Sequence, residues 1–339
     1  MSKFRVALIC AFLVPVGAMA ADVNLSDVDM SDVKLNVGGF IWGDVGFGDR
    51  YDGSDDDQVN IEKAAVSVSP EYKNTRASIM FGVDNILSDD PGSNGSNDDI
   101  EAVEAFVGIY WDLAGGKLDL TVGKQGLLFG LKPNGWVGDH SVNQGLEYGS
   151  GNGAAGPGIN VSGQVQTSVI VDWSLGENSN DSWSVRAGLF DGTGDTSMTD
   201  NWFIQGRTDN LLGTGVYGNV GYEQVDVGGS SEGIISIGAG MVIAKFDLSL
   251  EYQGIDQAIA GTAGDETQII AEAMWNYNED WSFYLDYATS DELDFDTTRL
   301  GAVWDYNEHF YFQLEYANDS SNINALDVNS IDLRLAFTF

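Results

Sequence analysis

The segment Ile331-Asp332-Leu333-Arg334-Leu335-Ala336-Phe337-Thr338-Phe339 alternates without a break between large apolar side chains and charged, small or hydroxylic ones. The apolar residues occupy every second position from Ile331 to Phe339, and a period of two places them on one face of a β-strand. The intervening residues, from Asp332 to Thr338, lie on the opposite face. The segment therefore predicts an amphipathic strand whose last residue is aromatic.

The same alternation recurs along the chain, for example from Phe246 to Gln253 and from Trp281 to Ala288. Sixteen segments are expected as strands: 35–47, 58–69, 75–84, 101–111, 117–125, 160–175, 182–190, 202–209, 214–225, 232–243, 245–255, 265–277, 280–289, 296–306, 308–318 and 328–339. Most of them have the length that a tilted strand needs to cross a bilayer. In a water-soluble barrel or sandwich the apolar faces point inward, whereas in a membrane barrel they point outward to lipid. The alternation by itself leaves both folds open.

The connections between the expected strands distinguish the two folds. Connections after even-numbered strands are short, such as 71–74 and 278–279. Most connections after odd-numbered strands are long and rich in Asp, Gly, Ser and Asn, such as 85–100, 126–159 and 319–327. Short periplasmic turns and longer extracellular loops produce this parity in membrane barrels. We therefore expect an all-β fold, a transmembrane antiparallel β-barrel of about 16 strands with both termini periplasmic.

Aromatic residues concentrate near the ends of the expected strands. Trp275, Tyr277 and Trp281 flank one short connection, and Trp304 and Tyr306 precede another. Because aromatic side chains gather at the two interfaces of a bilayer, this clustering predicts a girdle on the periplasmic side. A general enrichment of aromatic residues in strands is the alternative explanation.

The first twenty residues have the pattern of a secretory signal peptide. Lys3 and Arg5 form a basic start, an apolar run follows, and Ala18-Met19-Ala20 provides an A-x-A cleavage site. The single cysteine, Cys10, lies inside this signal. Export without disulfides favours the envelope of a Gram-negative bacterium.

The remainder, 21–339, is expected to form one outer-membrane barrel domain that begins with a short acidic periplasmic leader, 21–34. No zinc-ligand spacing, phosphate-binding loop or dinucleotide fingerprint occurs in the sequence, so no cofactor and no metal site is expected. Catalysis is not expected either. His140 and Ser141 are adjacent in a glycine-rich stretch, which does not provide the separate base, orienting partner and nucleophile that such chemistry requires.

The sequence carries 52 Asp and Glu residues against 15 Lys and Arg residues, a formal net charge of −37. A protein this acidic repels nucleic acid, and no nucleic-acid partner is expected. The Asp-rich segments 55–57, 89–90, 98–99 and 291–296 fall in expected extracellular loops. They offer the oxygen ligands that Ca²⁺ or Mg²⁺ prefers, for loose binding or for bridging lipopolysaccharide phosphates. A solvated acidic rim is the simpler explanation of these segments.

The last strand, with Leu335, Phe337 and Phe339 on its apolar face, resembles the C-terminal assembly signal of bacterial outer-membrane barrel proteins. The chain as a whole resembles the general porins of Gram-negative bacteria in strand number, length, terminal Phe and position of the longest connection. A local stretch, Thr121-Val122-Gly123-Lys124-Gln125 followed by Phe129-Gly130-Leu131, is similar to the strand that enters the third loop in porins. The resemblance implies a homotrimeric diffusion channel for small hydrophilic solutes in the cell outer membrane. It also implies contact with the lipid bilayer and lipopolysaccharide, and insertion by the outer-membrane assembly machinery.

In general porins the third extracellular loop folds into the barrel and narrows the channel, and the resemblance implies the same for 126–159. The charged residues Lys132, Asp139 and Glu147 are then the candidates for the pore constriction. The strand parity predicts a pore-lining wall whose candidate residues are Arg76, Glu104, Arg186, Arg207, Glu251, Glu272, Arg299 and Glu315. A structural ion pair with a neighbouring strand is the alternative role for each arginine.

By the same parity, acidic residues in the interior outnumber basic ones about two to one, and rings of Asp and Glu raise the local concentration of cations. We therefore expect a weakly cation-selective pore. Two other functions remain open. One is a substrate-selective porin for sugars or oligosaccharides, in which inward aromatics such as Tyr284 and Tyr311 form a track. The other is a non-transport barrel, an adhesin or structural protein that acts through its acidic extracellular loops.

Overall fold

The computed structural model describes residues 32–48, 58–84, 101–113, 115–127, 129–131, 165–175, 182–191, 200–227, 230–256, 265–291, 295–321 and 326–339. The expected signal peptide, 1–20, lies outside these residues. The described strands are β1 (Val33–Gly48), β2 (Gln58–Tyr72), β3 (Thr75–Asp84), β4 (Glu101–Leu113), β5 (Gly116–Gly126), β6 (Val165–Leu175), β7 (Ser182–Phe190), β8 (Trp202–Asn210), β9 (Val216–Val227), β10 (Ser230–Ile243), β11 (Phe246–Ile255), β12 (Glu266–Asn276), β13 (Trp281–Ser290), β14 (Phe295–Asn307), β15 (Phe310–Ser321) and β16 (Leu326–Thr338). A single-turn 3₁₀ helix, η4 (Leu211–Gly213), follows β8.

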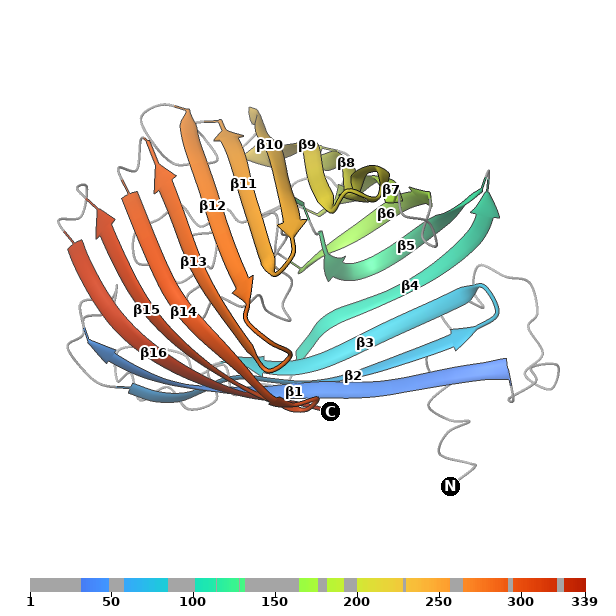
Figure 1. The fold of residues 1–339 in the computed structure, drawn as a ribbon. Helices are drawn as coiled ribbons and strands as arrows, with labels where there is room; N and C mark the ends of the chain where they lie inside the picture. Colours follow the sequence, from blue (N-terminus) through green and yellow to red (C-terminus); the bar gives the residue numbers. More distant parts are fainter. Residues whose placement is uncertain are drawn as a thin grey trace, which may run out of the picture.

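The strands form one closed antiparallel barrel. Each strand pairs with its neighbours in the sequence, and β1 also pairs with β16. Figure 1 shows this closure, where β16 runs beside β1 and ends at the C-terminus. The last residue contributes, since the Phe339 N–H donates to the Gly39 carbonyl (3.0 Å) and the Gly39 N–H donates to the Phe339 carbonyl (2.9 Å). The expected sixteen-stranded antiparallel barrel is confirmed.

The two faces of the barrel are the reverse of those of a water-soluble protein. In β16 the side chains of Leu333 and Leu335 are 40% and 45% exposed on the outer face, whereas Asp332 and Arg334 are 7% and 1% exposed and face inward. Each of the fifteen remaining strands, β1–β15, also exposes a large apolar side chain. In strand order these are Ile41, Val66, Phe81, Trp111, Val122, Val171, Val185, Ile204, Val220, Ile237, Leu250, Ile269, Leu285, Leu300 and Leu314. An apolar surface that encircles the barrel requires lipid as its solvent. The described residues contain no helix long and apolar enough to cross a membrane.

Short connections such as 73–74 and 308–309 join even-numbered strands to the next strand at one end of the barrel, called the turn end here; the opposite end is the loop end. At the turn end of β11–β16 the outward aromatic side chains form a nearly continuous row. Their ring centroids lie 6.1 Å apart for Phe246–Trp275, 5.6 Å for Trp275–Phe283, 5.7 Å for Trp281–Trp304, 5.3 Å for Trp304–Phe312 and 4.6 Å for Phe310–Phe337. The row has the position and composition of an interfacial girdle.

Two connections at the loop end are shorter than the sequence suggests. The connection expected over 319–327 is reduced to 322–325, and only 228–229 separates β9 from β10. Asp319, Ser320 and Ser321 fall in the expected connection, but they pair with Val328, Asp327 and Leu326 across β15 and β16. Beside these pairs the Asn318 Nδ2 atom donates to the Asn329 Oδ1 atom (2.8 Å). Backbone pairing requires no apolar side chains. The polar ends of strands that extend beyond the apolar band therefore cannot be predicted from the alternation of apolar residues.

Some long inward side chains reach across a whole strand at a glycine of that strand. The Tyr284 ring of β13 lies over Gly301 of β14, and its hydroxyl donates to Glu315 of β15 (2.5 Å). A Cβ atom at Gly301 would lie 2.0 Å from that ring. In the same way Tyr217 of β9 passes over Gly240 to donate to Asp247 of β11 (2.5 Å). These crossings tie together strands that share no backbone hydrogen bonds.

Candidate functional site

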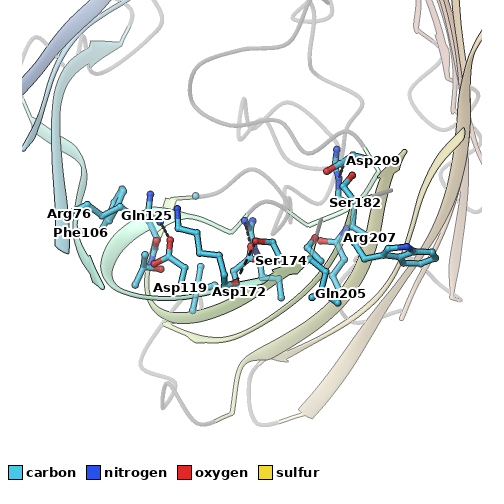
Figure 2. A pocket seen from close by; sticks show the side chains of 18 of the residues that line it. Arg76, Phe106, Asp119, Gln125, Asp172, Ser174, Ser182, Gln205, Arg207 and Asp209 are labelled. Carbon is cyan, nitrogen blue, oxygen red and sulfur yellow. Dashed lines mark hydrogen bonds and ion pairs between the residues drawn. The ribbon is translucent and has the colours of Figure 1, made fainter. Parts of the chain in front are cut away.

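A cavity of about 580 Å³ lies along the inner wall that β3–β8 form. Figure 2 shows its side chains side by side along this wall. Its charged lining residues are four bases and four acids: Arg76, Lys117, Arg186, Arg207, Glu104, Asp119, Asp172 and Asp209. Four of the eight residues expected on the pore wall, Arg76, Glu104, Arg186 and Arg207, therefore meet in one place. The described residues of the cavity wall carry no formal net charge, although the whole chain is strongly acidic.

Two ion pairs occupy the middle of this wall. The Arg76 Nη2 atom lies 2.5 Å from Asp119 Oδ2, and the Arg186 Nη2 atom lies 2.7 Å from Asp172 Oδ2. Arg76 reaches Asp119 by crossing β4 at Gly108, where a Cβ atom would lie 3.2 Å from the Arg76 Nε atom. Asp119 and Asp172 are direct partners in the β5–β6 register, so the two carboxylates adjoin at the centre with one guanidinium on each side.

The remaining bases of the cavity lie nearer the turn end. The Arg207 Nε atom donates to Asp209 Oδ1 on the same strand (2.6 Å). The Lys117 ammonium lies over the Tyr110 ring, 4.3 Å from its centroid. Partly exposed ion pairs of this kind stabilise a fold by at most about 1 kcal/mol. Their main effect is therefore on the electrostatic potential that a solute meets inside the barrel.

The chain that follows β5 turns into the barrel. The anchor segment, defined as residues 127 and 129–131, has three buried apolar side chains, Leu127, Phe129 and Leu131. The Phe129 ring packs on β9, where a Cβ atom at Gly221 would lie 2.6 Å from it. Since β5 pairs only with β4 and β6, contact with β9 requires the segment to cross the interior. The first residues of the third loop-end connection thus fold inward.

Two polar side chains of the wall hold the backbone of the anchor segment. The Gln205 Nε2 atom donates to the Gly130 carbonyl (2.7 Å), and the Leu131 N–H donates to the Glu251 carboxyl. Glu251 also accepts from the Ser236 hydroxyl (2.6 Å). Because Glu251 and Gln205 are almost fully buried, these bonds form away from water, where a missing partner costs about 1–3 kcal/mol. Glu251 therefore positions the segment rather than facing an open pore.

An apolar cluster surrounds the anchor segment on the inner face of the barrel. Its members are Leu127, Phe129, Ile170, Phe190, Phe203, Val225, Ile234 and Ile255. Glu223 lies among them, because its partners in the register are Phe203 and Ile234. The Glu223 side chain is fully buried, and neither carboxyl oxygen has a hydrogen-bond partner among the residues that the structure describes. The alternation of the sequence does not predict this cluster. Its only signal was the run Trp202-Phe203-Ile204, where the apolar-polar alternation breaks.

The other expected wall residues belong to a different part of the interior. Glu315 is fully buried and accepts from the Tyr284 hydroxyl, whose oxygen also accepts from Gln313 Nε2 (2.7 Å). Arg299 is 5% exposed and faces Asp286 in the β13–β14 register. These side chains form a dense polar network on β13–β16. Glu272 of β12 accepts from the Ser249 hydroxyl (2.7 Å).

The expected constriction residues Lys132, Asp139 and Glu147 lie outside the described residues. Within the part of the chain that the structure describes, no group of three or more His, Cys, Asp or Glu side chains is placed to hold a metal ion. The inward aromatics Phe40 and Tyr311 pack in an apolar cluster with Met80. Tyr284 and Tyr217 carry the glycine crossings described above.

No protein-family model and no curated protein matches the sequence. Solved structures do match the fold. OmpF of Salmonella typhi, in a complex with daunomycin, is 13% identical with a TM-score of 0.62, over 92% of this chain and 99% of that one. OmpT of Vibrio cholerae, in its trimer form, is 13% identical with a TM-score of 0.59, over 91% and 99%. An anion-selective porin from Comamonas acidovorans is 13% identical with a TM-score of 0.59, over 91% and 100%. The closed sixteen-stranded barrel, the apolar outer face and these likenesses together show that the chain has the fold of the general porins.

Proposed function

We propose that this protein is an outer-membrane porin, a water-filled channel through which small hydrophilic solutes diffuse passively. The observation that carries the proposal is the reversed barrel, which presents apolar side chains outward on every strand and encloses a wall of paired charges. An outward apolar band fits lipid, and an inward polar wall fits an aqueous path. The anchor segment supports a channel that the third loop narrows from inside. The proposal is of a channel rather than an enzyme.

Weak cation selectivity is the finer part of the proposal. The cavity of β3–β8 is balanced in charge, so selectivity has to arise from the surplus of carboxylates elsewhere in the interior and from Asp139 and Glu147 of the third loop. Carboxylates near an aqueous path raise the local cation concentration, and a Debye length of about 8–10 Å lets them act across a narrow pore. The acidic loops are proposed to face the cell exterior, where Ca²⁺ or Mg²⁺ can link them to lipopolysaccharide.

The proposed assembly is a homotrimer in the outer membrane of a Gram-negative bacterium, reached after export by the signal peptide 1–20. The trimer form of the OmpT barrel, which shares this fold, supports that state. Insertion by the outer-membrane assembly machinery is supported by the position of Leu335 and Phe339, which lie exposed on the outer face where the barrel closes.

Planar-bilayer recording of the refolded protein tests the proposal. We expect stepwise openings, in threes for a trimer, and a reversal potential across a KCl gradient that shows a modest preference for cations. A barrel that folds and inserts but carries no current would contradict the channel. A reversal potential of the opposite sign would contradict the cation selectivity while leaving the channel in place.

A further inference from the structure

The charges in the cavity of β3–β8 are ordered as well as balanced. The four that form the two ion pairs follow the order Arg76, Asp119, Asp172, Arg186 from β3 to β7, which is a plus–minus–minus–plus array; Glu104 of β4 and Lys117 of β5 line the same cavity outside these pairs. Asp119 and Asp172 are direct register partners, so their Cβ atoms lie about 4.5–5.5 Å apart. Like charges directly opposite each other on antiparallel strands repel. The space beside these two carboxylates therefore favours a cationic group.

The ion pairs of this array are not saturated. Arg76 contacts one oxygen of Asp119, and the other oxygen, Oδ1, has no hydrogen-bond partner among the described side chains and backbone. Arg186 directs both its Nε and Nη2 atoms to the same oxygen of Asp172 (2.8 and 2.7 Å). A guanidinium has five N–H donors and a carboxylate has about four acceptor sites, so each group keeps unused capacity. The side chains remain in contact with the cavity, since Arg186 is 28% and Asp172 is 23% exposed.

From this arrangement we infer that the cavity is a weak binding site for zwitterionic solutes that carry an ammonium and a carboxylate group, such as amino acids and short peptides. The ammonium group lies beside Asp119 and Asp172, and the carboxylate accepts from Arg186. The cavity, about 580 Å³, is of the size that holds a small ligand. The inference rests on the proposed channel function, because the solute reaches the wall by diffusion through the barrel.

Solutes with a single charge fit this array less well. An anion that contacts either arginine also meets the adjacent aspartates, and a cation that contacts the aspartates meets a guanidinium on both sides. A neutral solute forms only ordinary hydrogen bonds, which are roughly half as strong as those to charged groups. A zwitterion satisfies both signs without separating either ion pair completely. Binding has to stay weak enough for release, as conduction through any channel requires.

The test measures how added solutes reduce the ion current of the full-length protein in planar bilayers at 0.1 M KCl, where screening is modest. The probes are 4-aminobutanoate, a zwitterion, and butanamide, a neutral molecule of similar size. We expect half-block by 4-aminobutanoate at a concentration about tenfold lower than by butanamide, because the zwitterion gains charge-assisted hydrogen bonds. The ratio of the half-block concentrations of butanamide and 4-aminobutanoate should fall to near one in the double variant Asp172→Asn/Arg186→Gln. This variant keeps the net charge of the wall.

The charge-balanced control is Lys34→Gln/Glu71→Gln, a pair outside the cavity whose charged atoms lie 3.9 Å apart. This variant should keep the full preference for 4-aminobutanoate. Equal block by the two probes in a conducting channel would overturn the inference and leave the proposed function standing. A preference that survives in Asp172→Asn/Arg186→Gln would also overturn it. A folded barrel without any current would overturn the proposed function, and the inference with it.

Discussion

Single residues fix the path of the third loop where it enters the barrel. Gly221 provides the flat patch of β9 on which the Phe129 ring lies, and Gln205 and Glu251 hold the backbone of the anchor segment. None of these side chains is a charge in an open pore. They act by placing the segment that precedes the proposed constriction. Substituting them should therefore change the single-channel conductance more than the stability of the barrel.

Gly221→Val is expected to displace the anchor segment. The added side chain occupies the space of the Phe129 ring, which a Cβ atom alone approaches to 2.6 Å. The single-channel conductance should change and the current should fluctuate more, because the anchor segment loses its contact with β9 while the strands still pair. The matched control is Gly206→Val on the neighbouring strand, where the nearest atom to a Cβ lies 3.9 Å away. The same conductance in Gly221→Val as in the unchanged protein would contradict the assigned role of this contact.

Glu223 is expected to destabilise the barrel. Its carboxyl group is buried between Phe203 and Ile234 and has no hydrogen-bond partner within the described part of the chain, which costs about 1–3 kcal/mol relative to an apolar side chain of similar shape. Glu223→Leu should therefore raise the temperature at which the folded form is lost on a semi-native gel. Glu315→Leu should lower it, because this substitution removes the acceptor of the Tyr284 hydroxyl. A fall in both variants would show that Glu223 has a stabilising partner in solution.

At the scale of the strand, the barrel has two kinds of cross-link besides backbone pairing. On the outside, the aromatic row at the turn end connects β11 to β16 through ring contacts. On the inside, side chains cross a glycine to reach the strand beyond, as Tyr284 does over Gly301. The crossings explain why some glycines lie within regular strands, where glycine otherwise weakens pairing.

Gly301→Ala tests the crossing of β14. The new methyl group would lie 2.0 Å from the Tyr284 ring, so the ring has to move and its bond to Glu315 is lost. We expect a loss of about 1–3 kcal/mol in the free energy of unfolding, measured by urea titration in lipid vesicles. Gly206→Ala, which meets no close atom, should leave the stability unchanged or slightly higher. Equal effects of the two substitutions would argue against a structural crossing.

At the scale of the whole molecule, closure depends on the pairing of the two ends of the described chain. The Phe339 backbone completes the β1–β16 ladder at Gly39, while its ring stays 49% exposed on the lipid side. The backbone thus serves the fold, and the exposed ring is available for the proposed recognition by the assembly machinery.

Phe339→Ala separates these two roles. The backbone bonds to Gly39 remain, so refolding into detergent should proceed, but the amount of barrel assembled in the outer membrane of cells should fall several-fold. The control is Phe310→Ala, another outward aromatic at the turn end, which is 37% exposed. If recognition of the last residue is unimportant, both variants should assemble equally well.

The fold and the site differ in how far the sequence predicts them. Strand positions follow from a local period of two, and the expected bounds of β3 and β7, 75–84 and 182–190, coincide with the structure. Parity also places Arg76 and Arg186 on the inner face. It does not indicate which acid each one meets, because Asp119 is two strands from Arg76 and is reached only across Gly108.

The sequence alone determined that this chain forms a sixteen-stranded barrel with polar side chains inside, because alternation and turn spacing are local properties that each strand carries independently. Only the tertiary structure decided the site. The plus–minus–minus–plus array depends on the register between β3, β5, β6 and β7. The inward path of the anchor segment depends on contacts with β8, β9 and β11, which lie far away in the sequence. Register and long-range contacts arise only when the barrel closes, and no local pattern encodes them.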